Sequence, residues 1–400
     1  MSHKILILDT GKEWGGGTNS LIELLKRIDK NKYHFTAMFY NNYKRGSDSD
    51  IKTEIEKLGV DFLLLEQKKQ SLAVKILKEL ARSLLFFSSY RKYLVFWIDY
   101  HFRIKSDAKD IAEILTRQDI NLIYMNNQPS SNVEGIMAAK IVNIPSIQHS
   151  RIGADLHRFE VNAVNNWLTR MICVSQGVKE VFIKQGVDAS KCEVIYNGID
   201  SNIKPFMAAS EIRKKWGIKD NEILIGTVGS LIKRKRINDL IEALVELREK
   251  SDKPFKCMVV GDGPERENLQ KEVLQRGLKE EVIFTGFQSD AISYMNAMDI
   301  FVLPSEKEGL PRVILEAMLM ARPVVACNVT GSSELVIDGE TGFLVSVKGT
   351  DMLANALLKL VASDDLRRRM GEKSRMSVIE RFTIDKYVNG VSNIFEEVLA

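Results

Sequence analysis

The sequence predicts an α/β protein built from two Rossmann-like, doubly wound domains that face each other across a cleft. Its 400 residues exceed the usual size of one domain and suffice for two hydrophobic cores. Short apolar runs alternate with segments of helical periodicity, which is typical of parallel sheets covered by helices. This alternation starts at residues 4–9 and begins afresh at 222–229, so the chain carries two α/β sets of similar size.

The composition excludes several classes of protein. Hydrophobic residues make up 45% and charged residues 28%, which are ordinary globular values and not those of a disordered or fibrous chain. No apolar stretch reaches the roughly 18–20 residues of a membrane-spanning helix, and the first residues become charged too soon for a signal peptide. The 4 cysteines show no C-x-x-C spacing, so we expect no disulfide scaffold or zinc site, and a cytoplasmic location.

The first set opens with an apolar run that ends in a Gly-rich turn, followed by leucines spaced three to four residues apart as in a helix. Further strands of the first half are expected at 33–40, 60–65, 121–126, 144–149, 171–175 and 192–197. Helices are expected near 50–58, at 130–142 and after Gln176. The turn at Asn197-Gly198 follows this set and indicates a domain boundary nearby.

The second set repeats the alternation. Its strands are expected at 222–229, 255–261, 281–286, 299–305 and 323–327. Its helices are expected at 237–250, 264–276, 290–298 and 311–320, and the stretch 351–399 has a helical pattern. Parallel sheets of this kind bind ligands at the carboxyl ends of their strands, so the residues directly after each apolar run are the candidates for a site.

Two strand ends carry a pattern suited to anions. In the turn after residues 4–9, glycines such as Gly16 and Gly17 let backbone N–H groups approach an anion at a helix start, although a plain flexible turn also fits. After residues 222–229 come four consecutive cations, Lys233–Arg236, which can clamp a diphosphate. A solvated helix start or a nucleic-acid patch is the alternative for such a basic run.

The segment 305–317 is the most informative. Pro311 suits the first turn of a helix, so the N–H groups of Arg312 and Val313 are expected to form an anion site. Glu308 stands just before this helix, and Glu316 lies within an otherwise apolar helical run. A buried carboxylate needs hydroxyl or cationic partners, and a ribose diol fits, although a salt-bridged surface glutamate is the commoner case.

Other polar residues at these positions allow two interpretations. His149 ends the apolar run 144–149 and there can hydrogen-bond a ligand hydroxyl or phosphate, although a single histidine more often has a structural role. Asp48 and Asp50 have the D-x-D spacing of a metal site, but helix capping is the better interpretation because no strand precedes them.

Basic and aromatic residues concentrate in the stretch 68–105. It holds nine Lys or Arg against Glu79 and Asp99, and eight aromatic residues lie within 86–102. On one helical face, opposite the cations Lys75, Lys78 and Arg82, lie Leu77, Leu80, Leu84 and Phe87. We hypothesise that this stretch contacts an anionic membrane surface. The alternative is an ordinary helix with solvated lysines and buried aromatic residues.

The chain resembles, over nearly its whole length, the retaining glycosyltransferases of family 4 (glycosyltransferases group 1), which have the GT-B fold and use nucleotide-sugars. The resemblance rests on the E-x7-E pair Glu308 and Glu316, and on the motifs VIYNGID (194–200), VVGDGPE (259–265), VIFTGF (282–287) and DGETGFLV (338–345). It implies an N-terminal acceptor-side domain at 1–193, to which 380–400 return, and a C-terminal nucleotide-sugar domain at 194–379.

The resemblance also implies roles for single residues. Glu308 would hold hydroxyls of the donor sugar and Glu316 the ribose, while His149 matches a donor-site histidine. Groups expected at the donor phosphates are Lys235 and the backbone N–H groups of Gly16, Gly17, Arg312 and Val313. The chain departs from the family at Ser230, where an arginine is usual, and at Arg236, where a glycine is common. Arg234 and Lys233 are the candidates to supply the missing charge.

The resemblance implies a hexosyltransferase-type enzyme that retains the anomeric configuration, with a nucleoside-diphosphate sugar as substrate, UDP by family frequency. No metal or other cofactor is expected, since cations and helix N–H groups can stabilise the leaving diphosphate. We expect a lipid-linked acceptor in cell-envelope polysaccharide or lipopolysaccharide synthesis, used peripherally at the inner face of the membrane. A nucleotide-sugar 2-epimerase and a non-catalytic sugar-nucleotide-binding protein are the alternatives. No base-reading motif supports nucleic-acid binding.

Overall fold

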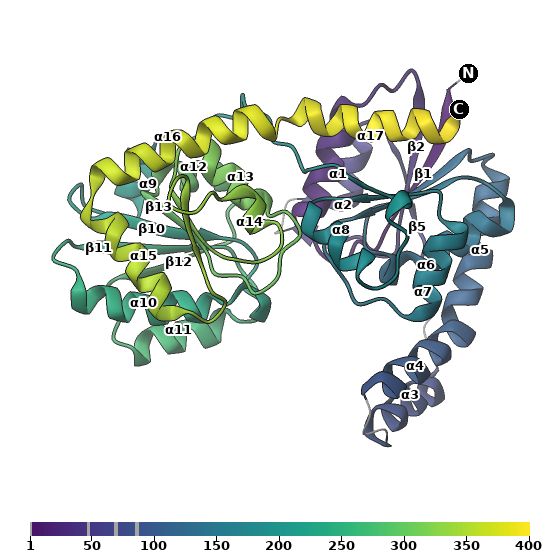
Figure 1. Ribbon diagram of the computed structural model, residues 1–400, viewed down its shortest axis with the longest axis horizontal. Coiled ribbons are helices and arrows are strands. Elements are labelled where there is room, and N and C mark those ends of the chain that lie inside the picture. The colour runs from purple at the N-terminus through teal and green to yellow at the C-terminus, as the bar shows by residue number, and fades with distance from the viewer. Residues whose placement is uncertain (1, 46–48, 68–70, 85–87) are drawn as a thin grey trace. The chain divides into compact units, whose positions relative to one another are not determined.

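The computed structural model describes residues 2–45, 49–67, 71–84 and 88–400. The chain forms two compact units, each with its own parallel sheet covered by helices (Figure 1). The first unit comprises residues up to Ile195 together with Val388–Ala400, and the second comprises Tyr196–Tyr387. The sequence placed the divisions at 193/194 and 379/380.

The first unit contains a seven-stranded parallel sheet with strand order β5-β2-β1-β6-β7-β8-β9. Its interior strand β1 is buried on both faces from Ile5 to Leu8, which explains the uninterrupted apolar run in the sequence. The strands are β1 (His3–Asp9), β2 (Tyr33–Phe39), β5 (Asp61–Leu64), β6 (Leu122–Met125), β7 (Ser146–Ser150), β8 (Arg170–Cys173) and β9 (Cys192–Val194).

Helices and a small hairpin connect these strands. The helices that flank the sheet are α1 (Gly16–Arg27), α2 (Ile51–Glu56), α5 (Lys105–Arg117), α6 (Pro129–Val142), α7 (Arg158–Trp167) and α8 (Gln176–Ile183), with a short 3₁₀ turn at Ala189–Lys191. The hairpin strands are β3 (Lys44–Arg45) and β4 (Ser49–Asp50). The Asp50 carboxylate accepts the Thr53 N–H and caps α2, so the capping interpretation is confirmed, while Asp48 lies outside the described residues.

The basic and aromatic stretch forms two helices, α3 (Leu72–Leu84) and α4 (Ser88–Asp99), which lie side by side and project from the sheet of their unit (Figure 1). A five-residue π-helical turn, Tyr100–Ile104, joins α4 to α5. A small core of Val74, Ala81 and Ile98 holds α3 against α4. Outside the described residues lie Lys68, Lys69, Phe86 and Phe87, and the side chain of Leu84.

The second unit contains a six-stranded parallel sheet with strand order β12-β11-β10-β13-β14-β15. The strands are β10 (Ile223–Val228), β11 (Phe255–Val260), β12 (Val282–Gly286), β13 (Ile300–Leu303), β14 (Val324–Cys327) and β15 (Gly342–Val345). The helices are α9 (Ala209–Lys215), α10 (Ile237–Lys250), α11 (Arg266–Gln275), α12 (Ala291–Ala297), α13 (Arg312–Leu319), α14 (Ser332–Leu335), α15 (Thr350–Ala362) and α16 (Asp364–Arg381), with a 3₁₀ turn at Lys233–Lys235. The last helix, α17 (Ile384–Leu399), carries the chain into the first unit.

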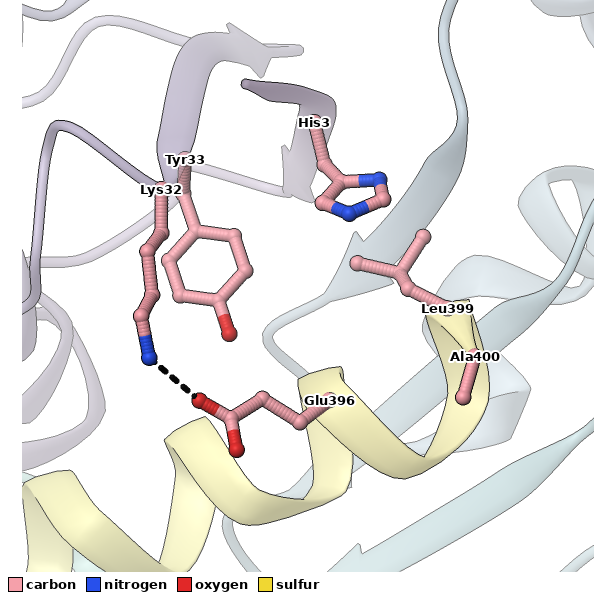
Figure 2. A pocket seen from close by; sticks show the side chains of 6 residues that line it. All are labelled: His3, Lys32, Tyr33, Glu396, Leu399 and Ala400. Atoms are coloured by element: carbon pink, nitrogen blue, oxygen red, sulfur yellow. Dashed lines mark hydrogen bonds and ion pairs between the residues drawn. The ribbon is translucent and has the colours of Figure 1, made fainter. Parts of the chain in front are cut away.

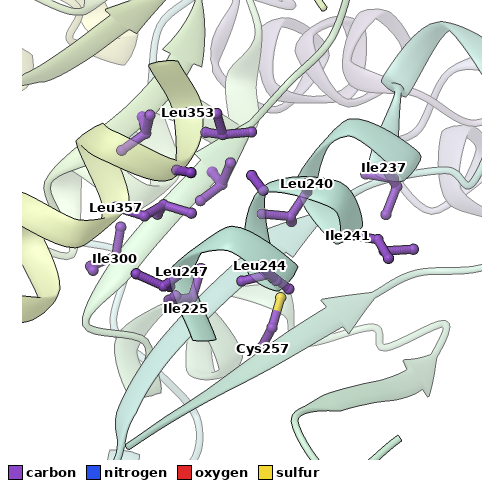
Figure 3. Packing of buried hydrophobic residues seen from close by; sticks show 14 of the residues in the cluster. Ile225, Ile237, Leu240, Ile241, Leu244, Leu247, Cys257, Ile300, Leu353 and Leu357 are labelled. Atoms are coloured by element: carbon purple, nitrogen blue, oxygen red, sulfur yellow. The ribbon is translucent and has the colours of Figure 1, made fainter. Parts of the chain in front are cut away.

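The core of the second unit lies where α10 and α15 pack on the sheet (Figure 3). Leu240 and Leu244 of α10 and Leu357 of α15 are fully buried in this cluster, together with Ile225 of β10 and Cys257 of β11. All four cysteines are buried free thiols. The spacing of the apolar residues in 237–250 therefore places one face of α10 on the sheet, as the sequence predicts.

Candidate functional site

Close backbone contacts bring together the loops that follow β10 and β11. Gly261 has a φ of +139°, and a Cβ at this position would lie 1.9 Å from the Gly229 carbonyl oxygen. A Cβ at Gly263 would lie 2.5 Å from the Leu231 carbonyl oxygen. Only glycine permits this approach. The packing of Gly261 and Gly263 against Gly229 and Leu231 fixes the chain that enters the cationic turn at 233–235.

Two of the four consecutive cations meet a buried carboxylate. Glu308, in the loop after β13, is 7% exposed, and its Oε1 lies 2.7 Å from Lys235 Nζ and 3.4 Å from Arg234 Nη1. Arg234 also donates from Nη1 to the Lys307 carbonyl oxygen at 2.7 Å. A carboxylate this deeply buried is costly unless it is paired, and here two cations compensate its charge.

The other two cations point elsewhere. Arg236 pairs with both oxygens of Asp239, through Nε at 2.6 Å and Nη2 at 2.7 Å, and its Nη1 lies 3.5 Å from Glu306. Lys233 is exposed and forms no ion pair within the described part of the chain. Arg236 also has a φ of +49°, a conformation that glycine adopts without cost and that explains why a glycine suits this position.

Helix α13 begins at Arg312, directly after Pro311, so the N–H groups of Arg312 and Val313 lie in its first turn as expected. The Arg312 guanidinium is buried, donates from Nη1 to the Gly198 carbonyl oxygen at 2.9 Å, and lies 3.6 Å from Glu316 Oε1 through Nη2. Glu316 is thus largely buried with a cationic partner one helical turn away. Sequence reasoning assigned only the backbone of Arg312 and missed its side chain.

In the first unit, the Gly-rich turn runs directly into α1, which starts at Gly16 with Gly15 as its N-cap. No side chain caps this end, and the first turn holds no acidic residue. A Cβ at Gly17 would lie 3.2 Å from Cγ of Arg151, so the arginine side chain lies against the turn. The backbone N–H groups of Gly16 and Gly17 are therefore placed at a helix N-terminus with a cation beside them.

His149, on β7, is fully buried, and its Nδ1 lies 2.5 Å from the Tyr124 hydroxyl. Burial, with a smaller contribution from the charge of Arg151, holds the pKa of His149 well below its ordinary value, so the imidazole is neutral. His149 thus lies within strand β7, inside the sheet, whereas Arg151 directly follows the carboxyl end of this strand.

Arg151 is a site residue that sequence reasoning missed. Its Nε donates to Asn126 Oδ1 at 2.8 Å, and Asn126 in turn donates to the buried carboxylate of Asp9 at 2.6 Å. Burial raises the pKa of Asp9 from its ordinary value. Asp9, Asn126 and Arg151 lie at the carboxyl ends of β1, β6 and β7. The sequence could indicate this group only through the polar side chain at each strand end.

A further group of buried carboxylates lies in the first unit. Glu134 of α6 accepts the Tyr40 hydroxyl at 2.8 Å and lies 3.6 Å from Arg103, which the π-helical turn supplies. Glu160 accepts the His157 N–H at 2.7 Å at the start of α7, and burial raises its pKa to about 7. Glu160 therefore titrates near neutral pH.

A pocket of about 310 Å³ lies away from the strand ends just described (Figure 2). It is lined at the amino ends of β1 and β2 by His3, Lys32 and Tyr33, and on the side of α17 by Glu396, Leu399 and Ala400. Lys32 Nζ and Glu396 Oε1 are 2.9 Å apart and tie this helix to the sheet. Because ligands of parallel sheets bind at the carboxyl ends, this pocket is not the candidate site.

The expected site residues thus form one group in each unit. Gly16, Gly17 and His149 belong to the first unit, with Arg151 added. The group in the second unit consists of Arg234, Lys235, Glu308, Arg312, Val313 and Glu316. Each group lies at the carboxyl ends of parallel strands.

Among the described residues, no helix is long and apolar enough to cross a membrane.

Two protein families match the chain. The family described as "Glycosyltransferase Family 4" matches residues 14–202, and "Glycosyl transferases group 1" matches residues 209–377. N-acetyl-alpha-D-glucosaminyl L-malate synthase of Bacillus anthracis is 25% identical over 73% of this chain and 78% of its own length. UDP-Gal:alpha-D-GlcNAc-diphosphoundecaprenol alpha-1,3-galactosyltransferase of Escherichia coli is 28% identical over 72% of this chain and 78% of its own length.

Solved structures share the fold over nearly the whole chain. Anabaena Alr3699/HepE in complex with UDP and glucose has a TM-score of 0.77 at 23% identity, and the match covers 99% of this chain and 100% of that one. The lipopolysaccharide outer core galactosyltransferase WaaB has a TM-score of 0.70 at 16% identity, and the match covers 98% and 99%. At these identities the likeness establishes the fold.

Proposed function

Because the chain belongs to the family 4 glycosyltransferases (glycosyltransferases group 1), which have the GT-B fold, we propose that it transfers a sugar from a UDP-sugar to a lipid-linked glycan in cell-envelope polysaccharide synthesis. Three relatives support the choice of donor and acceptor. One relative is named for a UDP-galactose donor and a diphosphoundecaprenol acceptor, and others are named for capsule and O-antigen synthesis.

The observation that carries the proposal is the buried Glu308 carboxylate paired with Lys235 at the carboxyl ends of β10 and β13. A carboxylate accepts hydrogen bonds from sugar hydroxyls, and a lysine attracts a diphosphate. The two groups therefore suit the two halves of a nucleotide-sugar. Glu316, held by Arg312 on the adjoining helix, is the proposed partner of the ribose hydroxyls.

We propose that catalysis consists mainly of stabilising the negative charge that develops on the leaving diphosphate. Lys235 and the N–H groups of Arg312 and Val313 supply that stabilisation in the second unit. The N–H groups of Gly16 and Gly17 are the corresponding donors in the first unit. The anomeric configuration is retained, with the donor phosphate accepting the proton of the attacking hydroxyl, and neutral His149 is the proposed hydrogen-bonding group near the transferred sugar.

Two other functions make different predictions. A nucleotide-sugar 2-epimerase needs no acceptor and would change the nucleotide-sugar itself. A non-catalytic protein would bind the donor but form no product, and the departure at Ser230 is the feature that favours this alternative. Incubation of the purified protein with UDP-sugars and a polyprenyl-diphosphate-linked sugar, followed by mass spectrometry, separates the three. We expect an acceptor heavier by one sugar; a changed donor or unchanged reactants would reject the proposal.

We further propose that α3 and α4 hold the enzyme on the anionic inner face of the membrane. Leu72, Ile76 and Leu80 of α3 are exposed by 73, 51 and 48%, and Tyr90 of α4 by 67%. Of the cations, Lys78 pairs with Asp99 at 2.7 Å, whereas Lys75 is exposed. The aromatic residues of this stretch fall into a packed and an exposed set. Phe96 and Trp97 pack against Phe159 of α7, whereas Phe102 is exposed. Exposed apolar side chains beside cations suit an anionic interface.

Vesicle flotation tests this surface. We expect the protein to float with vesicles that contain phosphatidylglycerol at low salt, and to float less when Leu72 and Ile76 are both changed to serine. Because these side chains are exposed, the double variant should keep its melting temperature. Phosphatidylcholine vesicles are the control for charge. Absence of binding by the unaltered protein would reject the membrane contact without touching the proposed reaction.

A further inference from the structure

We infer that the pocket between α17 and the amino ends of β1 and β2 binds one uncharged sugar ring, at a second site apart from the one proposed for the reaction. All residues that line this pocket belong to the first unit. They lie at the amino ends of the strands, whereas the residues proposed for the reaction lie at the carboxyl ends. This second site therefore goes beyond the proposed function and does not depend on donor binding.

The pocket has the size and the lining of a small-ligand site. Its volume of about 310 Å³ lies at the lower end of the range for ligand pockets, which suits a ligand of about one ring. The rings of His3 and Tyr33 and the side chain of Leu399 are turned toward the same space (Figure 2). They offer apolar surface to the C–H groups of a ligand, while Lys32 and Glu396 offer polar groups.

The Tyr33 hydroxyl is the group that points to a ligand. Tyr33 is 2% exposed, and its hydroxyl has no hydrogen-bond partner among the described residues. Its ring is held edge-on against Phe395 of α17, with 5.6 Å between the ring centroids. The hydroxyl points toward the ion pair of Lys32 and Glu396 (Figure 2). Because a buried hydroxyl without a partner is costly, a ligand that accepts its hydrogen bond is favoured here.

The charged groups of the pocket favour a ligand that is polar but uncharged. Lys32 Nζ and Glu396 Oε1 are 2.9 Å apart, and the hydrogen bond to Glu396 raises the pKa of Lys32, so the ammonium stays charged. The pair has no net charge and therefore offers an ionic ligand no surplus of either sign. The two side chains are 58% and 51% exposed, so the ammonium keeps further N–H donors and the carboxylate its other oxygen for a ligand.

A sugar ring matches this set of groups. Its hydroxyls both accept and donate hydrogen bonds, so they can accept from Tyr33 and Lys32 and donate to Glu396. Its C–H groups can pack on the apolar surface of His3 and Leu399. A carboxylate on the ring would be repelled by Glu396, and an ammonium would be repelled by Lys32. A bound sugar would also join α17 to the sheet, since it contacts both.

The test titrates the purified full chain with methyl α-D-glucopyranoside and methyl α-D-galactopyranoside, followed by saturation-transfer NMR. We expect at least one of them to bind with a dissociation constant on the order of 1–10 mM, which is usual for so small a ligand. Glucuronate and glucosamine carry a charge on a ring of the same size. Each should bind at least about threefold more weakly than the better methyl glycoside, because each meets one group of like charge in the pocket.

Two variants place the sugar in this pocket. Tyr33→Phe removes only the hydroxyl and should weaken binding about threefold to tenfold, the effect of one hydrogen bond. Because this hydroxyl lacks a partner in the described part of the chain, its loss should leave the melting temperature unchanged or raise it. Glu396→Gln should weaken binding by a similar factor. Glu397→Gln is the matched control, since Glu397 has the same charge but pairs with Arg170, and sugar binding should stay unchanged.

Three results would overturn the inference: no saturable binding of either methyl glycoside, equal binding by Tyr33→Phe, or stronger binding of a charged sugar than of both uncharged ones. An equal loss in Glu396→Gln and Glu397→Gln would likewise reject the pocket, because it would indicate a general effect on α17. If the unaltered protein binds the sugar as stated but transfers none, the proposed function fails alone. If it transfers sugar but binds none in this pocket, the inference fails alone.

Discussion

Substituting glutamine for Glu308 separates binding of the nucleotide from binding of the sugar. Glutamine keeps the size of the side chain and removes its negative charge. In the free enzyme the Glu308 carboxylate forms ion pairs with Lys235 at 2.7 Å and with Arg234 at 3.4 Å. The variant therefore frees both cations for an anionic ligand, while a sugar hydroxyl loses a charged acceptor.

The expected magnitudes follow from these contacts. A hydrogen bond to a charged group contributes about 1.5–3 kcal/mol, so kcat/KM for the UDP-sugar should fall by about 10-fold to 150-fold. The affinity for UDP, which carries no sugar, should stay the same or rise because Lys235 and Arg234 lose their competing partner. Sugar-nucleotide turnover and UDP binding by calorimetry are the two measurements.

Glu306 provides a matched control in the same loop. It is more exposed and pairs with Arg236 at 3.5 Å, so Glu306→Gln should leave both kcat/KM and UDP affinity nearly unchanged. If Glu308→Gln weakens UDP binding by the same factor as it lowers kcat/KM, then the carboxylate serves the nucleotide and our assignment to the sugar is wrong.

Three further predictions concern stability and donor binding. Arg312→Met removes the cation 3.6 Å from Glu316, so the donor KM should rise about tenfold with a smaller change in kcat, and Arg312→Lys should recover part of the loss. Gly331→Ala places a Cβ 2.0 Å from a backbone oxygen, so it should lower the unfolding free energy by about 3 kcal/mol or more; Gly339→Ala, also at positive φ but with open space, should cost only about 1–2 kcal/mol in the same urea titrations. Burial raises the pKa of Glu160 to about 7 above its ordinary 4.5, so the folded state takes up a proton between these pH values and loses stability as the pH rises through 7. The stability of Glu160→Gln relative to the unaltered protein should therefore increase from pH 5 to pH 8. A difference in melting temperature between the two proteins that stays the same over this pH range would contradict this.

Much of the fold can be predicted from the sequence, because buried parallel strands leave continuous apolar runs. Strand β1, buried from Ile5 to Leu8, is such a case. Edge strand β15 (Gly342–Val345) was not recognised as a strand, because it is short and only half buried, and Gly342 begins it. Two helices, at 105–117 and 158–167, were also missed. The basic and aromatic residues that lead into the first helix obscured its periodicity, and polar residues within the second helix obscured its own.

The site divides in the same way. Glu308 and Lys235 could be found from the sequence because each belongs to a motif that follows a strand. Arg151 and the Arg312 side chain could not, since their roles depend on contacts with residues far along the chain, Asn126 and Gly198. The choice between Lys233 and Arg234 likewise needed the three-dimensional position of Glu308, because both have the same charge and lie one residue apart.

The central claim, that the chain binds a UDP-sugar, is tested most directly by a thermal-shift screen of the purified protein. A ligand that binds only the folded state raises stability by about 2.7 kcal/mol when its concentration is a hundred times the dissociation constant. We predict a selective shift with UDP-sugars, unchanged by EDTA and smaller with GDP-, ADP- and TDP-sugars. Absence of a shift with every nucleotide-sugar, or a shift confined to a nucleotide other than UDP, would contradict the account.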